Sequence, residues 1–515
     1  MARSDTAARP GWVYLVGAGP GDPELITVRG AELLESADVV LHDELVDREA
    51  LRRARDDAEV RSVGKRGGDS ESRTEKQRTI NDDLVALAGA GKSVVRLKGG
   101  DPFLFGRGAE EASALREASV PFEVVPGVSS PLGATAYAGI PLTDRNHASS
   151  VTMVTAVTRD GKPFDLSRLA GLEGTLCVFM GVRRLGAICS QLVAVAGRAP
   201  DTPAAVVEWI SYPKQRVVDG TLANVAERAT DAGLGTPSLL IVGDVTRMRA
   251  ELSWFDRQPL FGQRVLVTRP AHQIGPTAAM LRRRGAQPIP FPTIALEPSL
   301  DPKRVARAVS ELSSYDLVAF TSDNGVQHFW SAIESAGRDA RAFGTARIAA
   351  IGPATARGLT RHGLRADLVA ETFVAEHLAE TILSSLAPGS RVLLPRAETA
   401  REILPETLRE AGMIVDVVPV YRTVTATPEH GLDRILDDVD IVTLTSSSTA
   451  DKLCELLGED AAELLADKVI ASIGPITTAT AQGHGLDVAV TATVSTSPGL
   501  VEALEAYFSA RVTGA

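Results

Sequence analysis

The chain of 515 residues has only three cysteines, Cys177, Cys189 and Cys454. An odd number at these spacings fits neither a disulfide framework nor a Cys-x-x-Cys metal site, so we expect structural burial for all three and no metal. No apolar run reaches the roughly 18 residues that a membrane helix needs. The N-terminal MARSDTAARPGW also lacks the apolar core of a signal peptide. The sequence therefore predicts a cytoplasmic protein without a membrane partner.

A surplus of positive charge is also missing. Lys and Arg total 54 against 65 Asp and Glu, and the net charge of −11 opposes nonspecific attraction to nucleic acid. We expect no nucleic-acid partner, and a polyanionic ligand would need a local cluster of basic residues. The 44% hydrophobic and 23% charged shares are those of a globular protein, which excludes fibres and disorder. At about 150 residues per domain, the length predicts three to four compact units.

The first half alternates strand and helix signals. Residues 12–126 place short apolar runs such as VYLVG and SVVRLKGGD between segments of helical periodicity, which predicts a parallel sheet in a βα repeat. In residues 151–245 the strand signals come closer together, which predicts a second α/β domain with a mixed sheet. A segment rich in Pro, Gly and aromatic residues indicates a linker at 251–263. We predict an α/β protein with a first domain at 12–250, divided into subdomains at about 12–145 and 146–250.

The second half, 264–515, repeats itself. RVLVTRP at 264, TSDNGV at 321 and IGPATA at 351 recur in the same order as RVLLPRA at 391, TSSSTA at 445 and IGPITT at 473. The three offsets of 127, 124 and 122 drift by only five residues, which indicates a duplicated βα array. Two such units predict a bilobed, duplicated α/β fold that holds its ligand between the lobes.

Two glycine-rich loops in the first half follow predicted strands. Gly17, Gly19 and Gly21 come directly after VYLV, where backbone amides can approach a ligand closely. A dinucleotide fingerprint needs glycine at the position of Asp22, which disfavours a nicotinamide or flavin oxidoreductase. A plain Gly/Pro turn stays open as the alternative for this loop. The second loop, in 96–108, also ends a strand, so we expect both to border one site.

Several long segments of the first half resemble uroporphyrinogen-III C-methyltransferases across residues 12–256. They are GAGPGDPELITVRGAELLESADVVLHDELV, GKRGG, RLKGGDPFLFGRGAEE, VPGVSS, AYAGIPLTDR, VFMG and QRVVDGTL. The resemblance implies a two-domain tetrapyrrole methylase fold with S-adenosyl-L-methionine as methyl donor. It further implies methylation of uroporphyrinogen III at C2 and C7 to precorrin-2, on the way to sirohaem or cobalamin, by a homodimer formed through this half.

The resemblance also implies site residues. The family's donor-binding positions fall on Pro20, Gly99, Gly100, Asp101, Leu104 and Met180. Its acid/base pair falls on Asp43 and Lys65, and Arg66 becomes a candidate ligand of the substrate carboxylates. Methyl transfer needs an aligned pyrrole carbon and the removal of one proton, so orientation plus one base suffices. The alternatives are an exposed strand-end carboxylate at Asp43 and a solvated surface pair at Lys65 and Arg66.

The first half departs from the family at three places. Thr155, Ala156 and Val157 replace the usual Thr-Gly-His, and the usual Glu-Asn-Gly-Thr reads Glu-Trp-Ile-Ser from residue 208. Ser129 and Ser130 stand where the family has Thr-Ala, and with Trp209 they join the candidate donor-binding residues. The Trp209 ring either stacks on the donor's adenine or obstructs it. These departures support the alternative of a tetrapyrrole-binding or sensor protein with a degenerate methyltransferase half.

The second half resembles uroporphyrinogen-III synthases over residues 263–508. The resemblance implies that hydroxymethylbilane loses water and closes with inversion of its last ring, between lobes at 264–298 plus 424–515 and at 299–423. Tyr421 matches a cleft tyrosine that could donate a proton to the departing hydroxyl, and its alternative is a half-buried strand tyrosine. Candidate ligands of the tetrapyrrole carboxylates are Arg269, Thr321, Ser322, Arg396, Arg422, Ser446, Ser447 and Thr477. Each Ser or Thr is equally an N-cap, and each Arg equally a surface ion pair.

Overall fold

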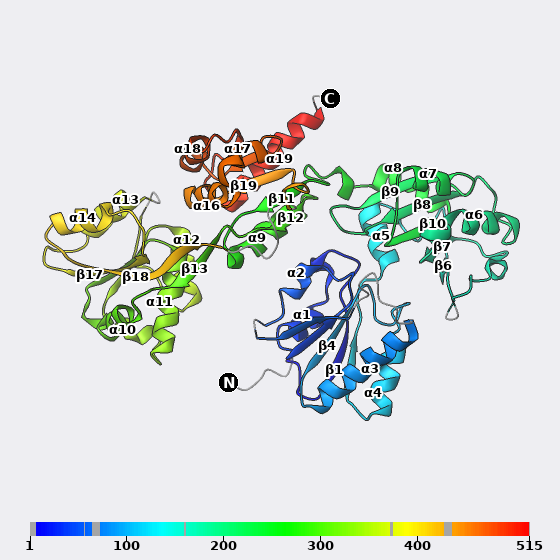
Figure 1. The fold of residues 1–515 in the computed structure, drawn as a ribbon, viewed down its shortest axis with the longest axis horizontal. Coiled ribbons are helices and arrows are strands. Elements are labelled where there is room, and N and C mark those ends of the chain that lie inside the picture. The colour runs from blue at the N-terminus through cyan, green and yellow to red at the C-terminus, as the bar shows by residue number, and fades with distance from the viewer. Residues whose placement is uncertain are drawn as a thin grey trace. The chain divides into compact units, whose positions relative to one another are not determined.

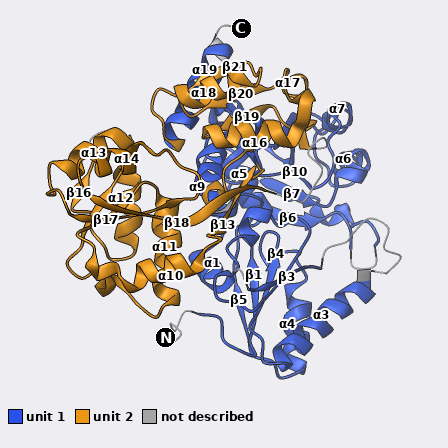
Figure 2. Cartoon of the chain, turned by 60° about the vertical axis from the view of Figure 1, so that its left-hand side comes forward, with its two compact units in different colours: residues 1–265, 275–289, 498–515 blue, residues 266–274, 290–497 orange. Residues whose placement is uncertain are grey.

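The computed structural model describes residues 7–55, 57–63, 73–158, 161–370, 374–426 and 435–513. Internal contacts divide the chain into two compact units, which Figure 2 distinguishes by colour. Unit 1 contains residues 1–265, 275–289 and 498–515, and unit 2 contains residues 266–274 and 290–497. In the described part of the chain, no helix is long and apolar enough to cross a membrane.

The first sheet is parallel throughout and has the strand order β3-β2-β4-β1-β5. Figure 1 labels its central strand β4 and the neighbouring strand β1. Its strands are β1 (Val13–Gly17), β2 (Val39–His42), β3 (Glu59–Ser62), β4 (Val94–Lys98) and β5 (Phe122–Val125). The apolar run of β1 suits a strand that helices cover on both faces, and β4 is apolar apart from Arg96 and Lys98. The predicted parallel βα repeat is confirmed.

Alternate residues of β1 feed two separate cores. Val13 and Leu15 pack with α3 (Arg73–Gly89) and α4 (Gly108–Glu117), while Tyr14 and Val16 pack with α1 (Val28–Leu34). This follows from the two-residue period of a strand, which sends successive side chains to opposite faces. A short helix, α2 (Arg48–Leu51), follows β2. The middle strand β4 is buried along its whole length, and its burial includes two charged residues.

The second sheet is mixed, as predicted, with the order β6-β7-β10-β8-β9. Only β6 and β7 run parallel. The strands are β6 (Val151–Thr155), β7 (Thr175–Phe179), β8 (Pro203–Glu208), β9 (Arg216–Thr221) and β10 (Ser238–Val242). The helices α6 (Leu185–Ala194) and α7 (Val225–Asp231) cover one face, and α5 (Ser130–Ala138) packs on the other.

All three cysteines are free and buried, which confirms their predicted burial. Cys177 lies in β7 and Cys189 in α6, each inside an apolar core. Burial raises the pKa of the Cys177 thiol to about 12 and that of Cys189 to about 11, because the thiolate loses its hydration. Both thiols are therefore packing groups rather than nucleophiles at neutral pH.

The segment that the sequence marks as a linker packs against α5. It follows α8 (Arg249–Leu252) and contains a 3₁₀ turn at Phe255–Arg257. The buried Phe255 ring meets the ring of Tyr137 at 4.8 Å, and the indole of Trp254 donates to the carbonyl of Ala136 at 2.6 Å. The predicted domain boundaries remain predictions.

The second half of the chain forms two further sheets. A six-stranded sheet has the order β13-β18-β17-β14-β15-β16, with β13 (Ile294–Pro298), β14 (Leu317–Phe320), β15 (Arg347–Ala350), β16 (Leu368–Val369), β17 (Arg391–Ala397) and β18 (Ile414–Thr425). A five-stranded sheet has the order β12-β11-β19-β20-β21, with β11 (Arg264–Val267), β12 (Gln287–Pro290), β19 (Ile441–Leu444), β20 (Val469–Ser472) and β21 (Val488–Thr491).

Helices follow the strands of both sheets. In the six-stranded sheet, α10 (Pro302–Ser310), α11 (Asp323–Ser335) and α12 (Pro353–Arg361) cover one face, and α13 (Ala375–Leu383) and α14 (Ile403–Glu410) cover the other. The remaining helices are α9 (Ala271–Arg282), α16 (Ser447–Leu457), α17 (Ala461–Leu464), α18 (Pro475–Gly483) and α19 (Ser497–Thr513).

The two copies of the repeat exchange strands between these sheets. The RVL strand of the second copy, β17, lies beside β14 and its neighbour β15 of the first copy. The RVL strand of the first copy, β11, lies beside β19 and its neighbour β20 of the second copy. The lobes that the resemblance to uroporphyrinogen-III synthases implies divide the strands of the two copies in the same way.

Candidate functional site

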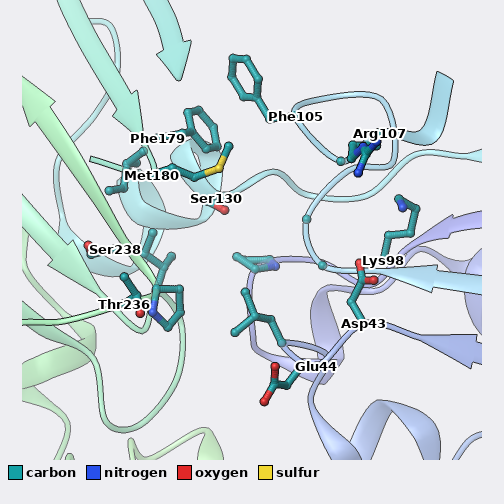
Figure 3. A pocket seen from close by; sticks show the side chains of 18 of the residues that line it. Asp43, Glu44, Lys98, Phe105, Arg107, Ser130, Phe179, Met180, Thr236 and Ser238 are labelled. Atoms are coloured by element: carbon teal, nitrogen blue, oxygen red, sulfur yellow. The ribbon is translucent and has the colours of Figure 1, made fainter. Parts of the chain in front are cut away.

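A cavity of about 790 Å³ lies inside unit 1, at the carboxyl ends of the strands (Figure 3). On one side it is lined by the loops that follow β1, β2 and β4 of the first sheet. On the other side it is lined by the loops that follow β7 and β8 and the turn that precedes β10. Open α/β sheets bind ligands at this end, and the volume suits a cofactor-sized molecule.

The floor of the cavity is bare backbone. Gly19 and Gly100 exchange two backbone hydrogen bonds, of 3.3 and 2.7 Å, which tie the first loop to the second. A Cβ added to Gly99 or Gly100 would meet its nearest heavy atom at 3.8 or 3.9 Å, which is an ordinary van der Waals distance, so neither glycine is tightly enclosed. Gly100 also has a φ of +69°, a conformation that favours glycine. Gly19 and Gly100 are buried and satisfy each other's backbone groups, so the exposed Gly99 is the part of this floor that a ligand can reach.

The glycine contact continues below the floor. An added Cβ would lie 2.6 Å from the Gly100 carbonyl oxygen if built on Gly17, and 2.3 Å from it if built on Gly127. Because these neighbours are backbone atoms, no side-chain rotation would relieve the clash. The Asp101 carboxylate reinforces the contact by accepting from the backbone N–H of Gly127 at 3.1 Å and of Phe103 at 2.8 Å.

A buried charge cluster lies under one wall of the cavity. Oε1 of Glu111, from α4, accepts from Lys98 Nζ at 2.8 Å and from Arg96 Nε at 3.2 Å. Gln77, from α3, donates to the same oxygen at 3.2 Å. The side chains of Arg96 and Lys98 are 2% exposed and that of Glu111 is 0% exposed. Buried charges are tolerated only when they are paired, so each member needs the others.

The cluster reaches the cavity through Asp43, which follows β2. Arg96 Nη2 donates to the Asp43 carboxylate, whose side chain is 36% exposed and lines the cavity beside Lys98 (Figure 3). Burial alone would lower the pKa of Arg96, but Asp43 and Glu111 outweigh it and raise that pKa. Burial, assisted by the charge of Arg96, lowers the pKa of Lys98. The arrangement orients one carboxylate at the cavity wall.

Trp209 forms part of the wall and leaves the cavity open. Its backbone N–H donates to the Pro237 carbonyl at 3.1 Å. Lys214 Nζ lies 3.3 Å from the centre of the indole, a cation–π contact, and the Tyr212 ring packs edge-on at 5.4 Å. Tyr212 in turn donates to the Leu45 carbonyl at 3.0 Å. The indole is thus held by its own neighbours in the sequence.

In the second half, Tyr421 meets a residue from a predicted strand end. The hydroxyl of Tyr421, in β18, lies 3.4 Å from Oγ of Ser322, and its ring stacks on His328 at 5.1 Å. Ser322 also caps α11 by accepting from the Gly325 N–H at 3.0 Å. The capping and ligand-binding interpretations of Ser322 are therefore compatible.

Comparison with known proteins assigns each half to a family. The family model of the tetrapyrrole (corrin/porphyrin) methylases matches residues 12–226, and that of the uroporphyrinogen-III synthase HemD matches residues 275–502. The chain is 37% identical over 452 residues to the porphyrin biosynthesis protein HemD of Ruminiclostridium josui, an alignment that covers 86% of this chain and 88% of that protein. The chain belongs to both families.

Two further likenesses are to C-methyltransferases. The chain is 37% identical over 356 residues to the uroporphyrinogen-III C-methyltransferase of Bacillus subtilis, covering 68% of this chain and 72% of that protein. It is 44% identical to the crystal structure of uroporphyrin-III C-methyl transferase from Thermus thermophilus complexed with S-adenyl homocysteine. That likeness covers 46% of this chain and 98% of the other, with a TM-score of 0.40. The protein is a fusion of a C-methyltransferase with a uroporphyrinogen-III synthase.

The cavity of the methyltransferase half brings together most of the residues predicted there. Those that line it are Pro20, Asp43, Gly99, Gly100, Ser130, Met180 and Trp209. Asp101 instead fastens the second loop, and neither Leu104 nor the buried Ser129 is among the described lining residues. Lys65 and Arg66 lie outside the described residues. Their roles remain predictions.

Sequence reasoning missed the cluster of Arg96, Lys98 and Glu111. A signal was present, because VVRLK places two charges inside an otherwise apolar strand at the middle of the sheet. Their partner Glu111 is separated from them in the sequence, and its burial becomes visible only when α4 packs on β4. Arg107, whose guanidinium pairs with Glu110 at 2.7 Å beside the cavity, was missed as well.

The arginines predicted for the synthase half all have partners. Arg396 donates to the Arg401 carbonyl and pairs with Glu402, and Arg422 pairs with Glu297. Arg269 donates to Ser497 and to Gln273, and burial lowers its pKa. A substrate carboxylate would have to share or displace these partners.

The hydroxyl residues predicted for the synthase half serve several local bonds. Ser446 caps α16 through a capping box with Thr449, and Ser447 accepts from Thr480 at 2.8 Å. Thr477 is buried in the first turn of α18, and Thr321 is half-buried directly after β14. Their roles in binding remain predictions.

The glycine contact predicts that Gly127→Ala displaces the loops of the floor. We expect a loss of about 1–3 kcal/mol in unfolding free energy, the usual cost of forcing an extra carbon into a packed site, together with weaker S-adenosylhomocysteine binding. Gly89→Ala, at a helical glycine with no atom within 4 Å of the added carbon, is the control and should be neutral. Denaturant titration and calorimetry measure both effects. Equal unfolding free energies and equal S-adenosylhomocysteine affinities in the two variants would contradict the predicted role of the glycine contact.

The charge cluster predicts that Glu111→Gln is strongly destabilising. Without this carboxylate, two buried cations share one amide oxygen, and breaking such a pair costs about 3–5 kcal/mol. Glu110→Gln removes the exposed neighbouring carboxylate and should cost less than about 1 kcal/mol. Urea unfolding of the full chain compares the free energies of unfolding of the two variants. A similar loss in both would show that the buried cluster contributes no more to stability than an exposed ion pair.

Proposed function

We propose that the first half transfers methyl groups from S-adenosyl-L-methionine to C2 and C7 of uroporphyrinogen III, giving precorrin-2. The observation that carries this proposal is the glycine floor of the cavity at Gly19, Gly99 and Gly100, where the absence of side chains lets a cofactor approach the backbone closely. Met180 and Trp209 add apolar surface at the wall. When bound, the donor supplies an electrophilic methyl group on a sulfonium.

The chain's own residues orient the acceptor and take up a proton. Each methylation forms a carbon–carbon bond, breaks the sulfur–carbon bond and releases one proton from the macrocycle. We assign the proton acceptor to the carboxylate of Asp43, because Arg96 holds it at the cavity wall. Lys65 and Arg66 complete the proposal as a second acid/base group and a carboxylate ligand.

For the second half we propose closure of hydroxymethylbilane to uroporphyrinogen III with inversion of ring D. The bilane loses its hydroxyl group as water, and Tyr421 donates the proton to the departing hydroxyl from its place beside Ser322. Because the bilane closes unaided to the uninverted isomer, the enzyme mainly has to control the shape of its substrate. The product of the second half is then the substrate of the first, within a homodimer formed through the methyltransferase half.

The proposed pair of reactions is tested by incubating the full chain with hydroxymethylbilane, with and without S-adenosyl-L-methionine. Without the donor we expect uroporphyrinogen III in excess over isomer I, and with it a product that carries two additional methyl groups. Chromatography and mass spectrometry separate these species. Isomer I alone would remove the synthase assignment. Isomer III that stays unmethylated would remove the methyltransferase assignment and favour a tetrapyrrole-binding or sensor role.

The role of Tyr421 predicts that Tyr421→Phe slows formation of isomer III at least about tenfold, because the general acid is lost. Methyl transfer from supplied uroporphyrinogen III should stay unchanged. The control is Tyr315→Phe, which removes another buried hydroxyl of the same core, one that donates to Asp416 at 2.7 Å. Equal damage to both reactions by Tyr421→Phe would count against separate sites.

A further inference from the structure

Among the residues that the structure describes, six cationic side chains line the cavity of the methyltransferase half, and most of them interact with other residues of the protein. The six are Lys76, Arg96, Lys98, Arg107, Arg183 and Arg184. Arg96 and Lys98 belong to the buried cluster around Glu111, and Arg107 pairs with Glu110. Lys76 has an interaction partner of its own. These four cationic groups thus interact mainly with other residues of the protein.

Arg183 and Arg184 differ from the other four. Both are exposed, and both lie in the 3₁₀ turn Val182–Arg184 between β7 and α6. Among the residues that the structure describes, neither guanidinium has an ion-pair partner. Each planar guanidinium carries five N–H donors, a geometry that matches carboxylates in bidentate fashion.

The surroundings of the two arginines favour the cavity side for an anion. Arg183 and Arg184 also line a groove of about 610 Å³, which shares Val182 with the cavity. The groove is lined by the carboxylates Glu227 and Asp231 as well, and these repel anions. The cavity side instead offers the apolar rings of Phe105 and Phe179, whose centres lie 4.7 Å apart, and the exposed Met180 (Figure 3).

We propose that Arg183 and Arg184 bind carboxylates at the edge of the tetrapyrrole and select an octacarboxylate substrate. This inference rests on the proposed methyltransferase function and names how the same site recognises its acceptor. A flat, apolar ring system with eight peripheral acids needs apolar contacts for its body and cations for its rim. The chain has a net charge of −11, so a polyanion needs a local cluster of basic residues in order to bind. Two guanidinium groups beside the cavity, without ion-pair partners among the described residues, form such a cluster.

The test is the double variant Arg183→Gln/Arg184→Gln in the full chain. We expect its KM for uroporphyrinogen III to rise about tenfold or more with kcat little changed, because charge-assisted hydrogen bonds to carboxylates contribute to binding. The affinity for S-adenosylhomocysteine should stay the same. A tetracarboxylate analogue, with methyl groups in place of the four acetates, should lose less affinity than the octacarboxylate. An unchanged KM would overturn the inference.

The control is Arg168→Gln/Arg247→Gln, which removes the same charge from exposed positions that do not line the cavity. It should leave the KM unchanged, and an equal rise in both double variants would reduce the effect to overall charge and overturn the inference. Titration with uroporphyrin III, an unreactive octacarboxylate, measures binding without turnover. If the double variant binds uroporphyrin III more weakly than the unaltered chain, but the unaltered chain transfers no methyl group, only the proposed function is refuted. Methyl transfer with an unaltered KM in the double variant would refute the inference alone.

Discussion

The methyltransferase half depends on one close backbone contact between Gly17, the last residue of β1, and two glycines that follow β4 and β5, Gly100 and Gly127. A single added carbon at Gly127 would lie 2.3 Å from the Gly100 carbonyl oxygen, so the contact exists only without side chains. It brings the first two loops together and turns Gly99 and Gly100 toward the cavity. The same lack of side chains that allows tight packing below the floor therefore leaves the cavity lined by backbone above it.

A second constraint lies one layer deeper. Arg96 and Lys98 occupy a central strand where apolar residues are the rule. Pairing with Glu111 and, for Arg96, with Asp43 makes their burial tolerable. Such a cluster is weak as a source of stability, but it orients the Asp43 carboxylate through Arg96. The polar interior is therefore best understood as support for the site. At the opposite side of the cavity lie Arg183 and Arg184. Unlike Arg96 and Lys98, they have no ion-pair partner among the described residues and can donate hydrogen bonds to a ligand.

Much of this architecture could be predicted from the sequence. The apolar runs predict the parallel sheet, and the three repeated markers predict a duplicated βα array. The exchange of β11 and β17 between copies follows from the lobes that the family resemblance implies. The sequence also predicts that the loop containing Gly99 and Gly100 borders the site. What could not be predicted depends on packing: the partner of Arg96 and Lys98 comes from a separate helix. The contact between Ser322 and Tyr421 could not be predicted either. A Ser after a strand is equally typical of a helix cap, and in the structure Ser322 both caps α11 and lies beside Tyr421.

The most direct test of the account is hydrogen–deuterium exchange of the full chain with and without S-adenosylhomocysteine. If the backbone floor holds the donor, the ligand should slow exchange of the amides in segments 18–22 and 99–107, and leave β13 and β18 of the synthase half unchanged. Protection confined to other segments, with the loops at Gly19 and Gly100 exchanging as before, would contradict the central claim that bare backbone forms the binding site.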